Sequence, residues 1–250
     1  MINKKVSNKC SIHSCFFKNT KGELTTQQII GLIILITSFV VVLILFMRLD
    51  LGKNSNAQLC YNSVALREKS VLKTEPLDCT VSYVCVSGGG NCVEGNYDSK
   101  VEIRQEQNEV FKVLAEELSD CWWMFGEGKV NYLGREISGK NHCAVCSRIS
   151  FDEKLKETFP TGISIEDFKN FLITTNVSNG EESYAKYLYD VNDFSLLTDK
   201  GWLLKEIDFK KDYLVFTGIG LGGNNILARF MAPDDISGAN VCDVFDLTKA

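Results

Sequence analysis

The feature that most constrains this chain is an uncharged stretch from Leu24 to Met47, LTTQQIIGLIILITSFVVVLILFM. As a helix, its strongly apolar part, Ile29–Met47, would extend roughly 28 Å, close to the hydrocarbon thickness of a bilayer. No polar face interrupts the run, which argues against a helix half-buried in a protein core. We therefore expect a transmembrane helix over residues 24–48, with the lipid bilayer as its partner.

The distribution of charge indicates a direction for this helix. Residues 1–23 carry five lysines and one glutamate, although the whole chain has a net charge of −5. The positive-inside rule then predicts a cytoplasmic N-terminus and an extracytoplasmic C-terminal domain of a single-pass cell-membrane protein. An acidic outer domain is repelled by phosphate backbones, so we expect no nucleic-acid partner.

The rest of the chain is predicted to form one α+β domain. We divide the chain into a basic tail or leader (1–23), a transmembrane helix (24–48), a linker (49–57) and an extracytoplasmic domain (58–250), the linker because residues 50–56 are rich in turn formers. Hydrophobic periodicity predicts a mixture of helices and antiparallel strands without regular βαβ alternation. The helices are expected at 58–72, 107–125, 164–174 and 182–189, and the strands at 80–86, 144–151, 212–221, 226–231 and 240–247.

An even number of cysteines in the outer domain predicts disulfides in an oxidising compartment, with a connectivity that spacing alone leaves open. A bridge within the hairpin around Ser87–Gly90 is plausible. The disulfide candidates are Cys60, Cys79, Cys85, Cys92, Cys121, Cys143, Cys146 and Cys242.

The pair Cys143-Ala-Val-Cys146 has two further interpretations beside structural bridges. It could be the redox pair of a thiol–disulfide oxidoreductase, but the strand-like residues after it differ from the helix that such a site needs. It could also bind zinc together with His142 and Cys121. We favour structural bridges and expect no metal and no cofactor.

The segment before the apolar run, Lys21-Gly22-Glu23-Leu24-Thr25-Thr26-Gln27, resembles a type IV pilin-like (class III) signal sequence. The resemblance implies cleavage between Gly22 and Glu23 on the cytoplasmic side, with the apolar helix retained and packed into a filament. The family often has glutamate at the fifth mature position, where this chain has Gln27.

The outer domain is similar, in residues 120–129 and 143–149, to uncharacterised single-pass membrane proteins of archaea. That resemblance implies no particular activity.

Other motifs carry weaker chemical signals. Asn176-Val177-Ser178 is an acceptor pattern for N-glycosylation. Gly218–Gly223 matches GxGxxG, but a turn between antiparallel strands explains it without a dinucleotide. The carboxylates that could pair for acid catalysis are Asp120 with Glu127 and Glu166 with Asp167.

We therefore expect a membrane-anchored extracytoplasmic structural or interaction protein. A pilin-like subunit, which associates with protein partners or with itself, is one form that such a protein can take. The alternative is a membrane-anchored thiol–disulfide oxidoreductase that uses Cys143 and Cys146. The sequence leaves enzymatic activity open and favours a non-enzymatic role.

Overall fold

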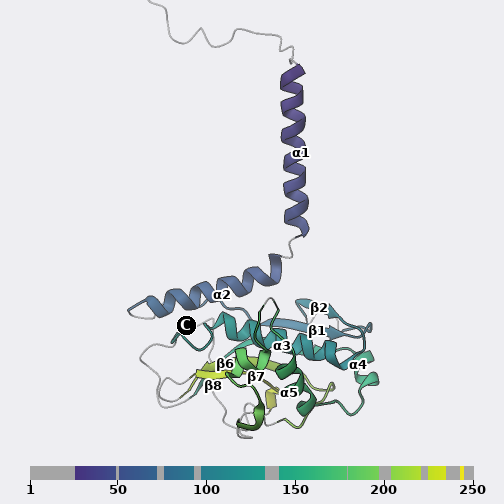
Figure 1. The fold of residues 1–250 in the computed structure, drawn as a ribbon, viewed down its shortest axis with the longest axis vertical. Coiled ribbons are helices and arrows are strands. Elements are labelled where there is room, and N and C mark those ends of the chain that lie inside the picture. The colour runs from purple at the N-terminus through teal and green to yellow at the C-terminus, as the bar shows by residue number, and fades with distance from the viewer. Residues whose placement is uncertain are drawn as a thin grey trace, which may run out of the picture. The chain divides into compact units, whose positions relative to one another are not determined.

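A computed structural model describes most of the chain outside the N-terminal tail. The described residues are 26–48, 51–71, 76–92, 97–132, 141–178, 180–196, 204–220, 225–234 and 243–244. The chain divides into two units, residues 1–50 and residues 51–250. The first unit contains helix α1 (Thr26–Arg48), and the second contains a sheet with helices packed against it (Figure 1).

The expected transmembrane helix over residues 24–48 has to be corrected. Among the described parts of the chain, no helix is both long and apolar enough to cross a membrane.

The second unit is an α+β domain, as expected, but its main sheet is mixed and not antiparallel. The strand order is β2-β1-β3-β6-β7, and β8 pairs with β3 beyond this path. The strands are β1 (Ser82–Ser87), β2 (Ser99–Glu102), β3 (His142–Phe151), β6 (Tyr213–Ile219), β7 (Asn225–Met231) and β8 (Asp243–Val244).

Three of the described strand pairs in this sheet are parallel. Strand β1 is parallel to both β2 and β3, and β8 is parallel to β3. The helix α3 (Gln107–Met124) lies between β2 and β3 in the chain, so β3 enters the sheet in the same direction as β1. Only the β3–β6 and β6–β7 pairs of this sheet are antiparallel among the described strands.

Helix α3 forms because its apolar residues recur at helical spacing, and the resulting face is buried against the sheet and its neighbouring helices. Gly126, with a φ of 76°, follows its end and takes a backbone conformation that favours glycine. The buried residues of α3 are Val110, Phe111, Val113, Leu114, Ala115, Glu117, Leu118, Cys121 and Trp122.

Helix α2 (Leu51–Lys69) begins at Leu51, earlier than the expected start at residue 58. Its residues Cys60 and Val64 are buried in the same core as α3. The ring of Tyr61 on α2 stacks on that of Trp123 on α3, with ring centroids 4.6 Å apart. Tertiary packing of this kind can stabilise a helix that contains residues of weak helix propensity.

The remaining elements are short and surround the sheet and α3. Two of them, α5 (Ile165–Thr174) and α6 (Tyr184–Tyr189), are capped by the residues directly before them, Ser164 and Ser183. The hydroxyls of these serines accept hydrogen bonds from backbone N–H groups of the first turn. These elements are α4 (Glu153–Thr158), α5 (Ile165–Thr174), α6 (Tyr184–Tyr189), the 3-10 helix η1 (Phe194–Leu196), and the two-stranded sheet of β4 (Ile163–Ser164) and β5 (Glu206–Ile207).

Candidate functional site

Three disulfides join pairs of described cysteines in the domain, which confirms the expectation of disulfide bonds. Cys60–Cys79 connects α2 to the segment before β1, Cys85–Cys92 closes the turn around Ser87–Gly90, and Cys121–Cys146 connects α3 to β3. All six cysteines are buried. Cys143 is also disulfide-bonded, whereas the candidate Cys242 lies outside the described residues.

The disulfide pairing bears directly on the Cys143–Cys146 motif. Cys146 is bonded to Cys121, so the two cysteines of the motif are not bonded to each other. Cys121, Cys143 and Cys146 are all oxidised, and zinc binds the thiolate form of cysteine. In this state they would therefore not hold zinc beside His142.

Of the two carboxylates that flank the tryptophan pair, Asp120 lies on α3 and Glu127 lies in a hydrogen-bonded loop after it. The Glu127 carboxylate accepts hydrogen bonds from Lys129 Nζ at 2.6 Å and from the Tyr187 hydroxyl at 3.0 Å. The hydrogen bond from Lys129 is the main cause of the lowered pKa of Glu127. Glu127 has a φ of 54° between two glycines of positive φ, so these bonds hold a tight turn against α6. Trp122 and Phe125 are core residues.

Asn176 is exposed on a short hairpin that follows α5. Its backbone bridges Ser183, and the side chain of Val177 packs against the core. The Ser178 hydroxyl lies 3.3 Å from a carboxylate oxygen of Glu116. Exposure of Asn176 and Ser178 is compatible with a glycan at Asn176, and its attachment stays a prediction. The processing candidates Gly22 and Glu23 lie outside the described residues.

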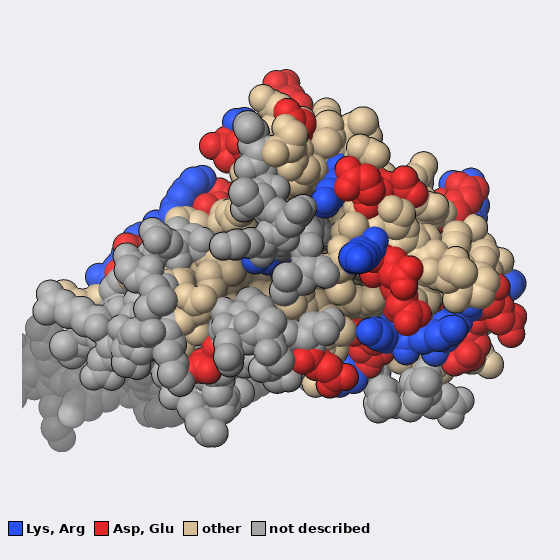
Figure 2. Space-filling view, turned by 90° about the horizontal axis from the view of Figure 1, so that it is seen from below, with Lys and Arg blue, Asp and Glu red and all other residues tan. Residues whose placement is uncertain are grey.

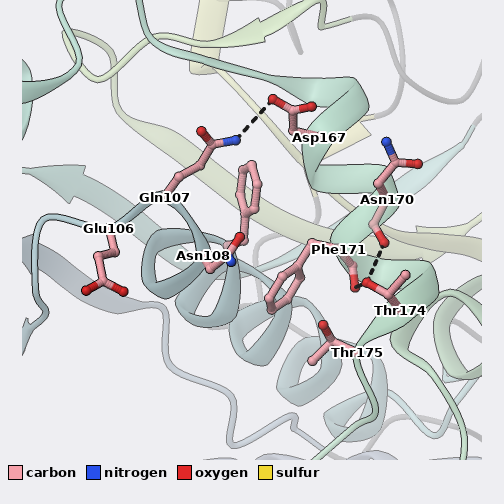
Figure 3. A pocket seen from close by; sticks show the side chains of 9 residues that line it. Glu106, Gln107, Asn108, Asp167, Asn170, Phe171, Thr174 and Thr175 are labelled. Carbon is pink, nitrogen blue, oxygen red and sulfur yellow. Dashed lines mark hydrogen bonds between the residues drawn. The ribbon is translucent and has the colours of Figure 1, made fainter.

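A groove lies between the start of α3 and helix α5 (Figure 3). It has a volume of about 700 Å³, within the range of roughly 300–1,000 Å³ typical of small-molecule sites. Its lining residues are Glu106, Gln107, Asn108, Phe111, Asp167, Asn170, Phe171, Thr174 and Thr175.

A hydrogen bond joins the two helices at one end of this groove. The Gln107 Nε2 group donates to Asp167 Oδ2 at 3.1 Å (Figure 3). The sequence offers Asp167 and Glu166 as a possible carboxylate pair. Glu166 instead forms an ion pair with Lys169 at 3.2 Å, so the two neighbouring carboxylates have different partners.

The sequence did not reveal the groove because its two walls are far apart in the chain. One signal was nonetheless present: Asp167, Asn170 and Thr174 recur at helical spacing around Phe171, which places them on one side of α5. The partner side, at the start of α3, becomes apparent only when the two helices pack.

Charges on the face shown in Figure 2 are mixed in sign over the described residues. Ion pairs in the domain include Arg148 with Asp212, Lys156 with Glu153 and Lys169 with Glu166. Comparison with known proteins found no matching family model, no matching curated protein and no matching solved structure. The arguments about function therefore come from the structure itself.

Proposed function

We propose that this chain is an extracytoplasmic structural and interaction protein, a pilin-like subunit in which helix α1 packs against α1 of other copies. The observation that carries the proposal is the surface of α1. Every residue from 29 to 44 is exposed, and the large apolar side chains among them are between 43% and 64% exposed. Contact with a second copy would remove much of this apolar surface from water.

The two hydroxyl side chains in this stretch do not create a polar face. The Thr37 hydroxyl donates to the backbone oxygen of Ile33 at 2.9 Å, and the Ser38 hydroxyl donates to that of Leu35 at 2.9 Å. Their hydrogen bonds are therefore satisfied within the helix. Full burial of one large apolar side chain contributes roughly 1.5–3 kcal/mol, so thirteen partly exposed ones provide a strong driving force for association.

The disulfides support the extracytoplasmic part of the proposal. Bridges of this kind persist in oxidising compartments and are rare where thiols are kept reduced. An oxidoreductase role is less well supported, because Cys121 is 0% exposed and Cys146 is 4% exposed. A catalytic disulfide has to be reached by the thiolate of its substrate.

The test measures association of the full-length chain. Copies labelled with donor and acceptor fluorophores are mixed in aqueous buffer without detergent, and energy transfer is followed as the protein is diluted. We expect transfer that unlabelled copies abolish. Transfer should be weaker for Gly31→Leu, because a leucine would hold apart two helices that approach each other closely at this glycine. The leucine has room within its own chain, since apart from its chain neighbours and the backbone of its own helix nothing lies within 4 Å of a Cβ at this position. Ile36→Leu, a change between isomers, is the matched control.

A chain that stays monomeric in buffer at all concentrations would contradict self-assembly. Mass spectrometry of protein from its own cells tests the pilin-like processing separately. We expect a mature N-terminus at Glu23, and an intact Met1 would exclude that processing.

A further inference from the structure

The groove between α3 and α5 has an aromatic floor. The rings of Phe111 and Phe171 lie with centroids 5.7 Å apart and planes tilted by 52°. Phe111 is buried and Phe171 is half-buried. An apolar floor with a few polar groups around it is the usual composition of a small-ligand site.

The polar groups around this floor are mainly neutral. Asn108 on α3 and Asn170 on α5 are exposed side-chain amides, each able to donate and to accept hydrogen bonds. Thr174 and Thr175 add hydroxyls at the end of α5. The Thr174 hydroxyl donates to the backbone oxygen of Asn170 at 2.9 Å, so it offers a ligand an acceptor. Figure 3 shows that these side chains come from both helices that line the groove.

The charges at the groove disfavour ionic ligands. None of its lining residues is Lys, Arg or His, so a phosphate or carboxylate would meet no positive side chain there. Its two carboxylates already have hydrogen-bond donors or cations nearby. Asp167 accepts from Gln107, and Glu106 lies 3.8 Å from a guanidinium nitrogen of Arg104. A cationic ligand would have to compete with these partners.

We propose that this groove is a binding site for a neutral carbohydrate. Sugar hydroxyls both donate and accept hydrogen bonds, which matches the amides of Asn108 and Asn170 and the threonine hydroxyls. The apolar face of a sugar ring can pack on the exposed part of Phe171, and the volume of the groove suits one or two sugar units. The proposal depends on the second unit alone and not on the association of α1.

The test uses the full-length chain in lauryldimethylamine oxide, a detergent without a sugar headgroup. The neutral probes are cellobiose, lactose and N,N′-diacetylchitobiose, and the charged probes are inorganic phosphate and trilysine. Calorimetry and saturation-transfer NMR measure binding. We expect at least one disaccharide to bind with a Kd of about 1 mM or tighter.

Variants locate the binding. Loss of one neutral hydrogen bond typically weakens binding by roughly two- to tenfold, so Asn108→Ala and Asn170→Ala should each raise the Kd by that factor. Asn62→Ala, which removes an exposed amide on α2 outside the groove, is the matched control and should leave the Kd unchanged.

Three results would overturn the proposal: no disaccharide binding tighter than about 10 mM, equal binding by the groove variants and the wild type, or preferred binding of phosphate or trilysine. Failure of the two proposals can be told apart. The groove variants should associate like the wild type in the energy-transfer assay, and Gly31→Leu should bind sugar like the wild type.

Discussion

At the scale of single residues, the Asp152 side chain connects the end of β1, the turn after it and the start of α4. One carboxylate oxygen accepts hydrogen bonds from the Ser87 hydroxyl at 2.8 Å and the Gly90 N–H at 2.6 Å, and the other accepts from the Leu155 N–H at 2.9 Å. The residue is 1% exposed. A Cβ at Gly90 would lie 2.7 Å from this carboxylate, so the close approach requires glycine. Asp152 thus connects the turn after β1 to the start of α4.

We predict that Asp152→Asn lowers the free energy of unfolding by about 2–3 kcal/mol at neutral pH, since hydrogen bonds to a buried charged group are among the stronger ones. Urea unfolding followed by circular dichroism measures the change. Asp212→Asn, which removes an exposed ion pair with Arg148, is the control and should cost about 1 kcal/mol or less. Equal effects of the two variants would contradict the structural role of Asp152.

The difference in stability between the wild type and Asp152→Asn should depend on pH. Burial alone would raise the pKa of Asp152, but the hydrogen bonds from Leu155, Ser87 and Gly90 together hold the pKa below its ordinary value. A carboxylate with a lowered pKa stabilises the fold above its unfolded pKa of about 3.9, and this stabilisation is lost as the pH falls through the folded-state pKa. The difference between wild type and Asp152→Asn should therefore shrink below about pH 4. A difference that stays constant down to pH 2 would contradict this assignment.

At the scale of elements, α3 organises the second unit. Its buried face packs in the main core, its first turn lines the groove, and Cys121 near its end is bonded to β3. The residue spacing along the chain predicted the helix. The bridge from Cys121 to Cys146, by contrast, depends on how α3 crosses the sheet.

The disulfides should differ in their contributions to stability. Cys121–Cys146 joins residues 25 apart and Cys85–Cys92 joins residues 7 apart. Loop-closure entropy then predicts a loss of about 3.5 kcal/mol for Cys121→Ala with Cys146→Ala, and about 2.4 kcal/mol for Cys85→Ala with Cys92→Ala. Thermal and urea unfolding of the double variants measure both losses. The reverse order would show that strain or residual structure outweighs chain entropy.

At the scale of the whole molecule, the chain consists of two units with different surfaces. The described side chains of the first unit are almost all apolar and exposed, whereas the second unit has its own core with three disulfides. A domain with its own core can in principle fold alone.

We predict that residues 51–250, produced in an oxidising compartment, fold without residues 1–50. The thermal unfolding midpoint should lie within about 4 °C of that of the same domain in the full chain, which corresponds to less than about 1–2 kcal/mol. The fragment should also be monomeric by light scattering, because it lacks α1. A fragment that is unfolded, or that associates as strongly as the full chain, would contradict this division of roles.

The local sequence pattern determined which segments become the main helices and strands. The spacing of Val110, Phe111 and Leu114 specifies α3, and Ser164 specifies the start of α5, because helix periodicity and capping act over a few residues. The even number of cysteines also predicted disulfides, because disulfide formation depends on composition and compartment.

Only the tertiary structure decided three features: the parallel pairing of β1 with β3, the bonding of Cys146 to Cys121 instead of Cys143, and the placement of Asn108 and Asn170 in the lining of one groove. Each of these joins residues that are distant in the chain, and their proximity depends on how α3 and α5 pack against the sheet. Packing of this kind is a property of the whole core, and a short stretch of sequence does not encode it.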